Sequence, residues 1–297
     1  MEKIKLVLGL FGLENLFNGD ISSYIEISQM AEELGFDSVS VTDHVVMGKN
    51  LHNYPFGKFP LPSESPWYEP LSLLTMIASN TTKIKLATAI LIAPLRNPAL
   101  LAKTTATLDV ISKGRLELGV GLGWQKEEFD AAGLNFEDRS EIFWETLDIC
   151  KLLWKDSPIS FHGDYYNFDD IWCHPQPIQQ NDLPLLFGLK MTEKNAKKIA
   201  KIGHGWIPIK TSIDFISAGK NFLIDSLLSD GRQDQPRIRG QLPTCVDSNG
   251  IPDINLTLLE LEKSRVAGLN EIEIFPINFV NEPDNLYPVL KLISEVK

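Results

Sequence analysis

Eight short apolar runs alternate with helix-forming segments along this chain of 297 residues. Each run is short enough for a β-strand and is followed by a segment with apolar residues at helical spacing. Parallel strands need such helical crossovers, so the alternation predicts repeated βα units. The expected strands cover residues 4–9, 36–42, 84–92, 116–124, 183–189, 204–209, 238–242 and 271–277.

Eight βα units favour a single (β/α)8 barrel, a TIM barrel, formed by one domain over residues 1–297. A doubly wound sheet is the alternative, and it would normally carry a phosphate-binding glycine fingerprint after the first strand. Gly9, Gly12 and Gly19 do not match that fingerprint. Two long segments, about 45–67 and 155–182, interrupt the repeat, and we expect both to be insertions on the C-terminal face of the barrel.

Composition and charge restrict the class of protein further. Acidic residues outnumber basic ones, 39 against 28, and both signs are interspersed, which argues against a nucleic-acid-binding surface. No apolar run approaches the roughly 18 residues that a membrane-spanning helix needs. Cys150, Cys173 and Cys245 are widely spaced and odd in number, as is typical of free thiols in a reducing compartment. We therefore expect a cytoplasmic protein that binds neither membranes nor nucleic acid.

The carboxyl ends of the strands build the active site in a barrel of this kind. In this chain those ends combine a single histidine with apolar side chains and bare backbone. They are Asp43-His44 for the second strand, Ala89-Ile90 for the third, Gly121-Leu122-Gly123-Trp124 for the fourth and Gly188 for the fifth. Glycines strip side chains from one face of a strand, so a flat ligand can lie against main chain there. The same glycines would also relieve crowding where a barrel strand bends, and spacing alone does not separate the two interpretations.

Three familiar barrel chemistries match these strand ends poorly. Metal-dependent hydrolases need closely spaced histidines, and the five histidines here are scattered singly, so we expect no metal site. Glycosidases need two carboxylates, but only Asp43 has a strong strand-end position, with Glu69 a distant second. No GxSxG nucleophile elbow is present. What remains favours a protein that holds a planar redox cofactor and lets it carry the chemistry.

Several runs of the chain keep both identity and order with a known superfamily. They are Gly35-Phe36-Asp37-Ser38-Val39 through Thr42-Asp43-His44, Leu91-Ile92-Ala93-Pro94-Leu95-Arg96-Asn97-Pro98, Leu108-Asp109 through Gly123-Trp124, Glu127-Glu128-Phe129, Arg139 and Gly205-Trp206-Ile207-Pro208. Over roughly residues 4–210 the chain resembles the bacterial-luciferase-like superfamily, and most of all its coenzyme F420-dependent oxidoreductases. The resemblance implies a TIM barrel, a deazaflavin (F420) or FMN cofactor, a small organic substrate and, by analogy, a homodimer.

The resemblance also implies roles for single residues. His44 matches a histidine that relatives place beside the reactive ring carbon. Apart from the resemblance, Asp43 is the second expected catalytic residue, as a group that orients its neighbour or bonds a loop rather than as an acid. Ala89-Ile90 matches a non-proline cis peptide that supports the ring from behind. Trp124 stands where sugar-phosphate-oxidising relatives carry a glutamate, so their acid–base arrangement does not carry over.

The fifth strand departs from the pattern of the relatives, which commonly have a Gly-Gly pair and a small polar residue around the cofactor phosphate. Here Gly188 is followed by Lys190 and Thr192 at the expected start of a helix, where N–H groups, a charge and a hydroxyl can bind an anion. We expect these three residues to meet the phosphate. The ring is expected at Ala89, Ile90 and the glycine-rich segment 121–124.

Three functions stay open at this point. The leading interpretation is an oxidoreductase that transfers a hydride between F420 and a small organic substrate, with His44 supplying or taking the matching proton. The first alternative is an FMN-dependent monooxygenase that traps oxygen as a peroxyflavin under a water-excluding lid. The second, motivated by the altered fifth strand, is a non-catalytic flavin-binding protein. Trp67 either lines a pocket or packs under a loop, and Arg96 either grips an anion or forms a structural salt bridge.

Overall fold

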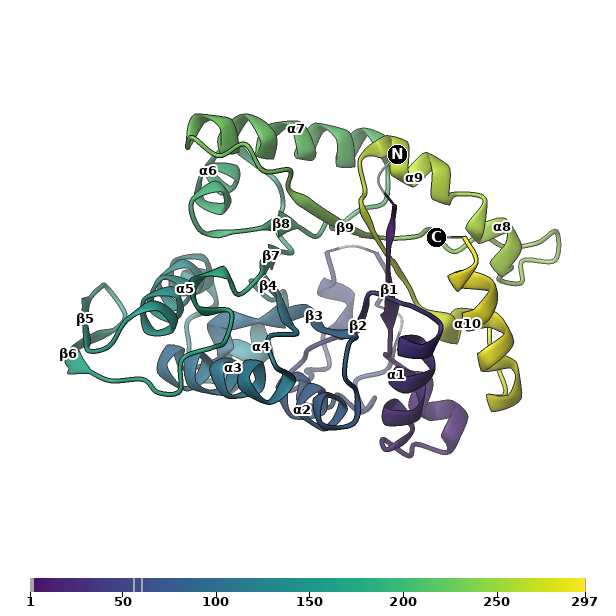
Figure 1. The fold of residues 1–297 in the computed structure, drawn as a ribbon, viewed down its shortest axis with the longest axis horizontal. Helices are drawn as coiled ribbons and strands as arrows, with labels where there is room; N and C mark the ends of the chain where they lie inside the picture. The colour runs from purple at the N-terminus through teal and green to yellow at the C-terminus, as the bar shows by residue number, and fades with distance from the viewer. Residues whose placement is uncertain (1–2, 56, 60, 297) are drawn as a thin grey trace. The chain divides into compact units, whose positions relative to one another are not determined.

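The computed structural model describes residues 3–55, 57–59 and 61–296 of the chain (Figure 1). Within them, eight parallel strands form a closed barrel in the order β1-β10-β9-β8-β7-β4-β3-β2, which confirms the predicted TIM barrel. The strands are β1 (Lys5–Gly9), β2 (Ser38–Val41), β3 (Lys85–Ile92), β4 (Leu116–Gly121), β7 (Leu185–Phe187), β8 (Gly205–Trp206), β9 (Arg237–Gln241) and β10 (Glu271–Ile274). Every residue of β2, β4 and β10 is buried, as expected for parallel strands covered on both faces.

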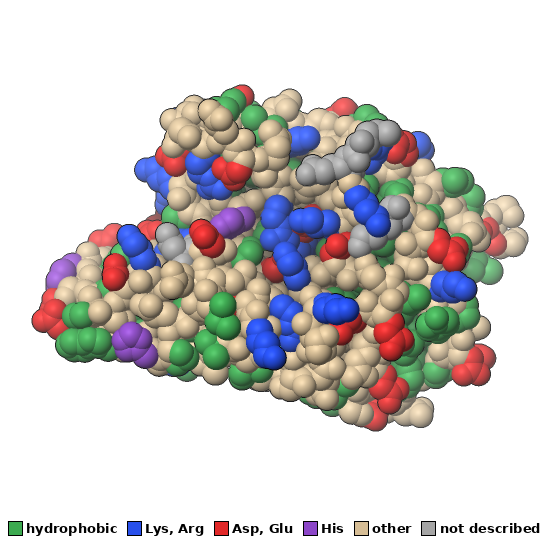
Figure 2. Space-filling model, in the orientation of Figure 1, with side chains coloured by type: hydrophobic (Ala, Val, Ile, Leu, Met, Phe, Trp, Pro, Cys, Tyr) green, Lys and Arg blue, Asp and Glu red, His purple; other side chains and the backbone are tan. Residues whose placement is uncertain are grey.

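Helices follow the strands in alternation. They are α1 (Ser23–Glu33), α2 (Pro70–Asn80), α3 (Pro98–Ser112), α4 (Lys126–Ala131), α5 (Arg139–Lys155), α6 (Glu193–Ile202), α7 (Ile213–Ser229), α8 (Ile254–Leu258), α9 (Leu261–Ala267) and α10 (Leu286–Ser294). Among the described residues, no helix is both long enough and apolar enough to cross a membrane. Acidic and basic side chains both occur across the face shown in Figure 2.

The described residues fall into two compact units, and the expectation of a single domain stays a prediction. One unit comprises the described parts of Met1–Val41, Asn80–Ala87 and Leu185–Lys297. Its apolar core includes Leu6, Leu8 and Trp206, each wholly buried. The same unit contains a buried cluster of charged side chains, in which Arg237 and Arg239 both donate hydrogen bonds to the Glu271 carboxylate. A buried charge needs such partners to be tolerated.

The second unit comprises Thr42–Ser79 and Thr88–Pro184. Its helix α3 begins where the Asn97 side chain accepts N–H bonds from Ala99 and Leu100. The helix ends at Lys113 and Gly114, which both take the left-handed conformation and turn the chain toward β4. Both ends of this helix are therefore set by local features of the chain.

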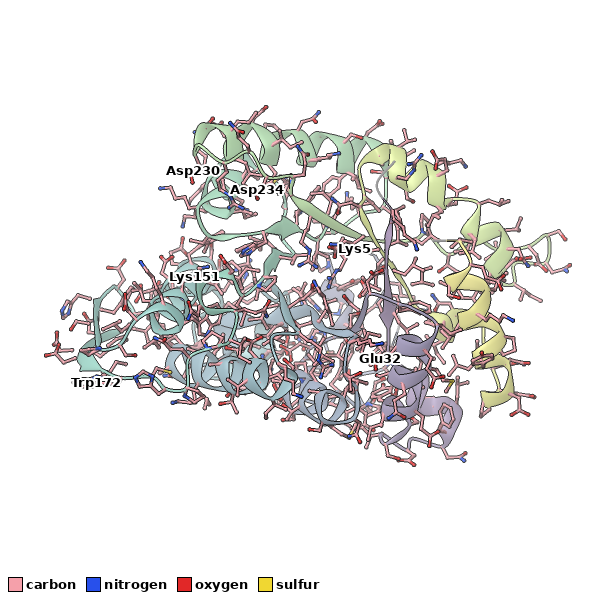
Figure 3. The ribbon with its side chains drawn as sticks, in the orientation of Figure 1. Lys5, Glu32, Lys151, Trp172, Asp230 and Asp234 are labelled. Atoms are coloured by element: carbon pink, nitrogen blue, oxygen red, sulfur yellow. The ribbon has the colours of Figure 1, made fainter. Side chains whose placement is uncertain are left out.

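Both expected insertions lie in the second unit and differ in structure. The segment 45–67 contains one 3-10 turn, Leu51–Asn53, and its residues 56 and 60 lie outside the described residues. The segment 155–182 contains an antiparallel hairpin of β5 (Ile159–His162) and β6 (Asn167–Ile171). Trp172 follows β6 (Figure 3), and its side chain is 64% exposed.

Candidate functional site

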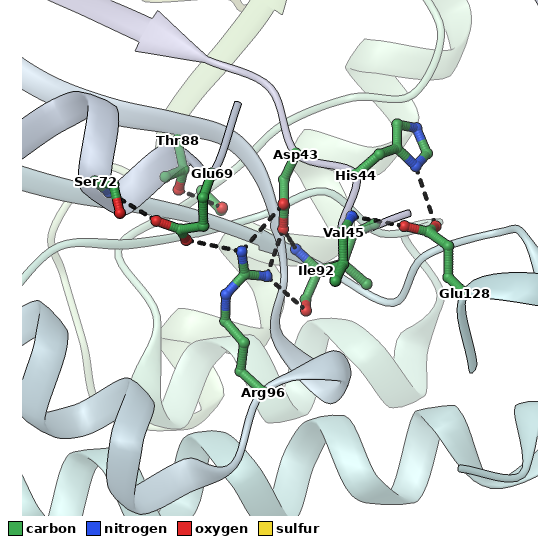
Figure 4. A network of polar contacts seen from close by, with 10 residues as sticks. Asp43, His44, Val45, Glu69, Ser72, Thr88, Ile92, Arg96 and Glu128 are labelled. Carbon is green, nitrogen blue, oxygen red and sulfur yellow. Dashed lines mark hydrogen bonds and ion pairs between the residues drawn. The ribbon is translucent and has the colours of Figure 1, made fainter. Parts of the chain in front are cut away.

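Asp43 and His44, which follow β2, are both buried, and each is held by a different part of the chain (Figure 4). The N–H of Ile92 donates to Asp43 Oδ2 at 2.8 Å. Arg96 donates to both carboxylate oxygens of Asp43, at 2.6 and 3.1 Å. Because a bidentate Arg–carboxylate pair is geometrically specific, it fixes the Asp43-His44 segment against the end of β3.

Arg96 is also bound to Glu69, with Nη2 3.0 Å from Oε1. Burial acts to lower the pKa of Arg96, but the carboxylates of Asp43 and Glu69 raise it above its ordinary value. The pKa of Glu69 is lowered, since the Ser72 N–H and Arg96 outweigh the opposing effect of burial. Of the two roles that the sequence allows for Arg96, the structure shows the salt bridge.

The imidazole of His44 is held by Glu128. Nδ1 of His44 lies 3.0 Å from Glu128 Oε2, and the Val45 N–H donates to Glu128 Oε1 at 2.9 Å. The Glu128 side chain is fully buried and that of His44 is 8% exposed. Glu128 lies in the first turn of α4, so this short helix presents a carboxylate directly to the histidine that the sequence singles out.

Residues around the start of α4 also hold the segment that follows His44. Gln125 accepts the Gly48 N–H at 2.7 Å and donates to the Gly48 carbonyl at 3.2 Å. The Asn50 side-chain amide donates to Glu127. A Cβ at Gly48 would lie 2.7 Å from Cβ and Cγ of Glu127, so glycine permits this close approach. The first residues of the 45–67 insertion are therefore fastened to α4.

Aromatic rings surround the imidazole of His44. Trp67, Phe59 and Trp124 meet it edge to face, with centroid distances of 4.5, 5.9 and 6.0 Å. Tyr54 lies 5.1 Å from the rings of both Phe59 and Trp124, and burial raises its pKa. We refer to Tyr54, Phe59, Trp67 and Trp124 as the aromatic shell. Trp67 thus contacts the candidate catalytic residue directly, and the shell restricts access of water to it.

The expected ring-binding residues lie within the second half of β3 and at and beyond the end of β4. The peptide bond between Ala89 and Ile90 is cis, as the resemblance implies. The Thr88 hydroxyl donates to the Gly119 carbonyl at 2.7 Å, which joins the two strands. Thr88 is wholly buried, whereas Ala89 and Ile90 are half-buried and so retain accessible surface.

Beyond β4, Gly121 is buried and Leu122, Gly123 and Trp124 are half-buried. Gly123 has φ of 78°, and a Cβ there would lie 2.8 Å from Ile92 Cγ2 and 3.2 Å from Phe129 Cε2. Local packing therefore accounts for glycine at position 123. A contact between Gly123 and a cofactor stays a prediction.

The expected phosphate-binding residues belong to the other compact unit. Gly188 is half-buried, and Lys190 and Thr192 are exposed. Thr192 caps α6, where its hydroxyl accepts the Asn195 N–H at 3.2 Å, and the Lys190 carbonyl accepts from the Asn195 side chain at 2.9 Å. The predicted helix start is confirmed, and phosphate binding by these residues stays a prediction.

The sequence pattern assigns no role to Gln125 or Glu128. Their signal is position, because both lie in the loop and helix that follow β4, and the segments after barrel strands carry functional groups. What the sequence does not reveal is that Glu128 meets a residue 84 positions away. Over the described ranges, no group of three or more His, Cys, Asp or Glu side chains is arranged to hold a metal ion.

Comparison with known families gives a match over most of the chain. A family model described as luciferase-like monooxygenase matches residues 9–249. An uncharacterised protein of Mycobacterium tuberculosis, Rv0953c, is 30% identical over 234 residues, which cover 76% of this chain and 79% of that protein.

Two relatives with named activities differ in cofactor. The F420-dependent glucose-6-phosphate dehydrogenase of Amycolatopsis mediterranei is 29% identical over 62% of this chain and 52% of its own length. The FMNH(2)-dependent dimethylsulfone monooxygenase of Pseudomonas putida is 30% identical over 57% of this chain and 43% of its own length. By their names, the proteins to which this chain is similar therefore include both F420-dependent and FMNH(2)-dependent enzymes.

Solved structures reproduce the fold at low sequence identity. The monooxygenase RslO1 from Streptomyces bottropensis has a TM-score of 0.82 at 18% identity and covers 98% of both chains. An F420-dependent secondary alcohol dehydrogenase in complex with an F420-acetone adduct has a TM-score of 0.78 at 18% identity, covering 100% of this chain and 98% of that one. At this identity the likeness supports the barrel architecture alone.

Proposed function

Because the chain belongs to the luciferase-like monooxygenase family, we propose that it is an F420-dependent oxidoreductase in which His44 handles the proton that accompanies hydride transfer. The family includes F420-dependent and FMN-dependent enzymes, as the names of two relatives state. The proposed substrate is a small, largely apolar alcohol or the corresponding carbonyl compound. The observation that carries the proposal is a buried histidine whose Nδ1 is engaged by a buried carboxylate.

Acid–base chemistry is the reason for preferring F420. Oxidation of an alcohol removes a hydride from carbon and a proton from oxygen, and the reverse reaction returns both. A positioned histidine suits the proton transfer because its ordinary pKa lies near neutral pH. When bound, the deazaflavin would accept or donate the hydride.

The described residues fit a flat cofactor in two respects. Ala89, Ile90 and Leu122 leave apolar surface accessible at the ends of β3 and β4. Lys190 and the start of α6 offer a charge and backbone N–H groups suited to a phosphate. We propose that the first group, together with Gly121, Gly123 and Trp124, holds the ring. Lys190, with Gly188 and Thr192, is proposed separately as a phosphate-binding group of the other compact unit.

The residues around His44 would act in fixed positions. Asp43 would serve as a positioning residue, since Arg96 and the Ile92 N–H occupy its carboxylate. His44 Nε2 would take the proton from the substrate hydroxyl during oxidation and return it during reduction. The aromatic shell would keep bulk water away from the reacting groups.

A second candidate, FMN-dependent monooxygenation, is favoured by the aromatic shell. Trp67 and Phe59 belong to the 45–67 insertion and lie against the His44 ring. Oxygen chemistry on a reduced flavin depends on exclusion of water, which such a cover would provide.

Two assays, one anaerobic and one aerobic, separate the candidate functions. Purified protein with oxidised F420 and a panel of secondary alcohols should reduce the cofactor without oxygen, and His44→Ala should abolish that activity. His162→Ala is the matched control, because His162 is exposed on β5 and contacts Asp169 rather than the aromatic shell. Oxygen consumption with reduced FMN and no turnover of F420 would establish the monooxygenase instead. Cofactor binding with no turnover, and no effect of His44→Ala, would indicate a non-catalytic flavin-binding protein.

A further inference from the structure

The Glu128 carboxylate contacts both the imidazole of His44 and the backbone N–H of the residue that follows it. Its two carboxylate oxygens have different partners, the Val45 N–H on Oε1 and His44 Nδ1 on Oε2 (Figure 4). The carboxylate is fully buried, so water does not compete for either oxygen. Glu128 therefore contacts the imidazole at Nδ1, one of its two ring nitrogens.

Donor and acceptor chemistry decides the tautomer. An ionised carboxylate has only acceptor sites, and a neutral imidazole has one N–H and one bare nitrogen. With Oε2 of Glu128 at 3.0 Å from Nδ1, the favourable arrangement places the hydrogen on Nδ1. The lone pair then resides on Nε2.

We infer that Glu128 is a positioning residue that holds His44 in the Nδ1–H tautomer, with Nε2 as the proton acceptor for the substrate. The inference rests on the proposed function for its chemical consequence. In alcohol oxidation the O–H bond would break and its proton would form a bond with Nε2, while the carbon–oxygen bond would become a carbonyl. The hydride lost from carbon would be taken up by oxidised deazaflavin, when bound. The opposite tautomer would present an N–H to the substrate hydroxyl and take no proton from it.

The surroundings of His44 leave this role to Glu128. The rings that meet the imidazole are those of Phe59, Trp67 and Trp124, which carry no charge. The neighbouring carboxylate, Asp43, is engaged by Arg96 and by the Ile92 N–H. Glu128 thus contacts the imidazole directly, through Oε2 and Nδ1.

Glu128→Gln provides the sharpest test, because the amide keeps the shape of the side chain and changes its hydrogen-bonding pattern. The amide oxygen can still accept the Val45 N–H, and the NH2 group then faces His44 Nδ1 as a donor. His44 must respond by moving its proton to Nε2. Asp130→Asn is the matched control on the same helix, since Asp130 is exposed and pairs with Lys126.

Nitrogen-15 NMR of histidine-labelled protein reads the tautomer directly, with His44→Asn used to assign the resonances. Wild type is expected to show the Nδ1–H pattern at His44, and Glu128→Gln the Nε2–H pattern. In steady-state assays, Glu128→Gln is expected to lower kcat for alcohol oxidation about 100-fold or more with little change in KM. Glu128→Asp should recover part of the loss, and Asp130→Asn should behave as wild type.

An Nε2–H pattern in the wild-type spectrum would overturn the inference whether or not any variant folds. An unchanged kcat in a folded Glu128→Gln protein would overturn it as well. The spectrum requires neither cofactor nor substrate, so failure of the proposed F420 chemistry with an Nδ1–H spectrum would remove the proposed function and leave the tautomer assignment standing.

Discussion

Replacing Arg96 by methionine should destabilise the protein strongly, because it leaves the buried Asp43 carboxylate without its cationic partner. The Asp43 side chain is 1% exposed and the Arg96 side chain 13%. Breaking a buried ion pair by removing one partner costs about 3–5 kcal/mol. Asp43 retains the Ile92 N–H, so we expect a value near the lower end, about 3 kcal/mol.

A substitution of Asp43, the other member of the ion pair, gives a second expected free-energy cost. Asp43→Asn keeps an oxygen that can accept the Ile92 N–H, and we expect a cost of about 2 kcal/mol. The double variant, Asp43→Asn with Arg96→Met, leaves neither charge buried. Its cost should therefore be about 3 kcal/mol rather than the sum of the two single changes.

Urea denaturation monitored by tryptophan fluorescence measures these differences as shifts in the transition midpoint at constant slope. Glu69→Gln is the comparison for an exposed partner of the same arginine, with an expected cost of about 0.5 kcal/mol. The reasoning fails if Arg96→Met costs less than about 1 kcal/mol, the range of a surface ion pair. It also fails if the costs of the single variants simply add.

Three further predictions concern local structure. The N–H groups of Ile84, Lys83 and Thr82 oppose the effect of burial and lower the pKa of Glu32 (Figure 3) from 4.5 to about 2, so its stabilising contribution is present above pH 4.5 and is lost as pH falls toward 2. Glu32→Gln should thus be less stable than wild type by about 1 kcal/mol at neutral pH, with the difference vanishing in urea titrations near pH 2. Asn97→Ala removes the cap of α3 and should cost about 1 kcal/mol in the same assay, whereas full stability would show that the cap contributes nothing. A Cβ at Gly205 would lie 2.1 Å from the Arg237 carbonyl oxygen, so Gly205→Ala should cost at least about 2 kcal/mol, and an unchanged thermal midpoint would contradict that packing.

Hydrophobic periodicity predicted the barrel because the barrel strands are mostly buried on both faces, while the helices bury one face. Boundaries were predicted less well. The expected strand 204–209 shortens to Gly205–Trp206, since Pro208 lacks the N–H that would continue a parallel ladder. Helix α4 has too few residues for a helical period to be visible.

In the candidate site, too, some residues could be predicted from the sequence and others could not. His44 and Asp43 were predicted because the end of a barrel strand is a position that sequence can locate. The partners of those two residues come from elsewhere in the chain, Arg96 from beyond β3 and Glu128 from α4. Such pairings are set by tertiary packing, and no local pattern encodes them. The aromatic residues of the shell are visible in the sequence, but the contacts that Phe59, Trp67 and Trp124 make with His44 are not.

Anaerobic titration of the purified protein with oxidised F420, followed by the fluorescence of tryptophans such as Trp67 and Trp124, tests most directly whether this barrel seats a flat redox cofactor beside His44. Saturable quenching at micromolar F420, about −8 kcal/mol of binding free energy, with weaker binding of FMN, is the expected result. Absence of saturable binding of either cofactor up to about 1 mM would contradict the account.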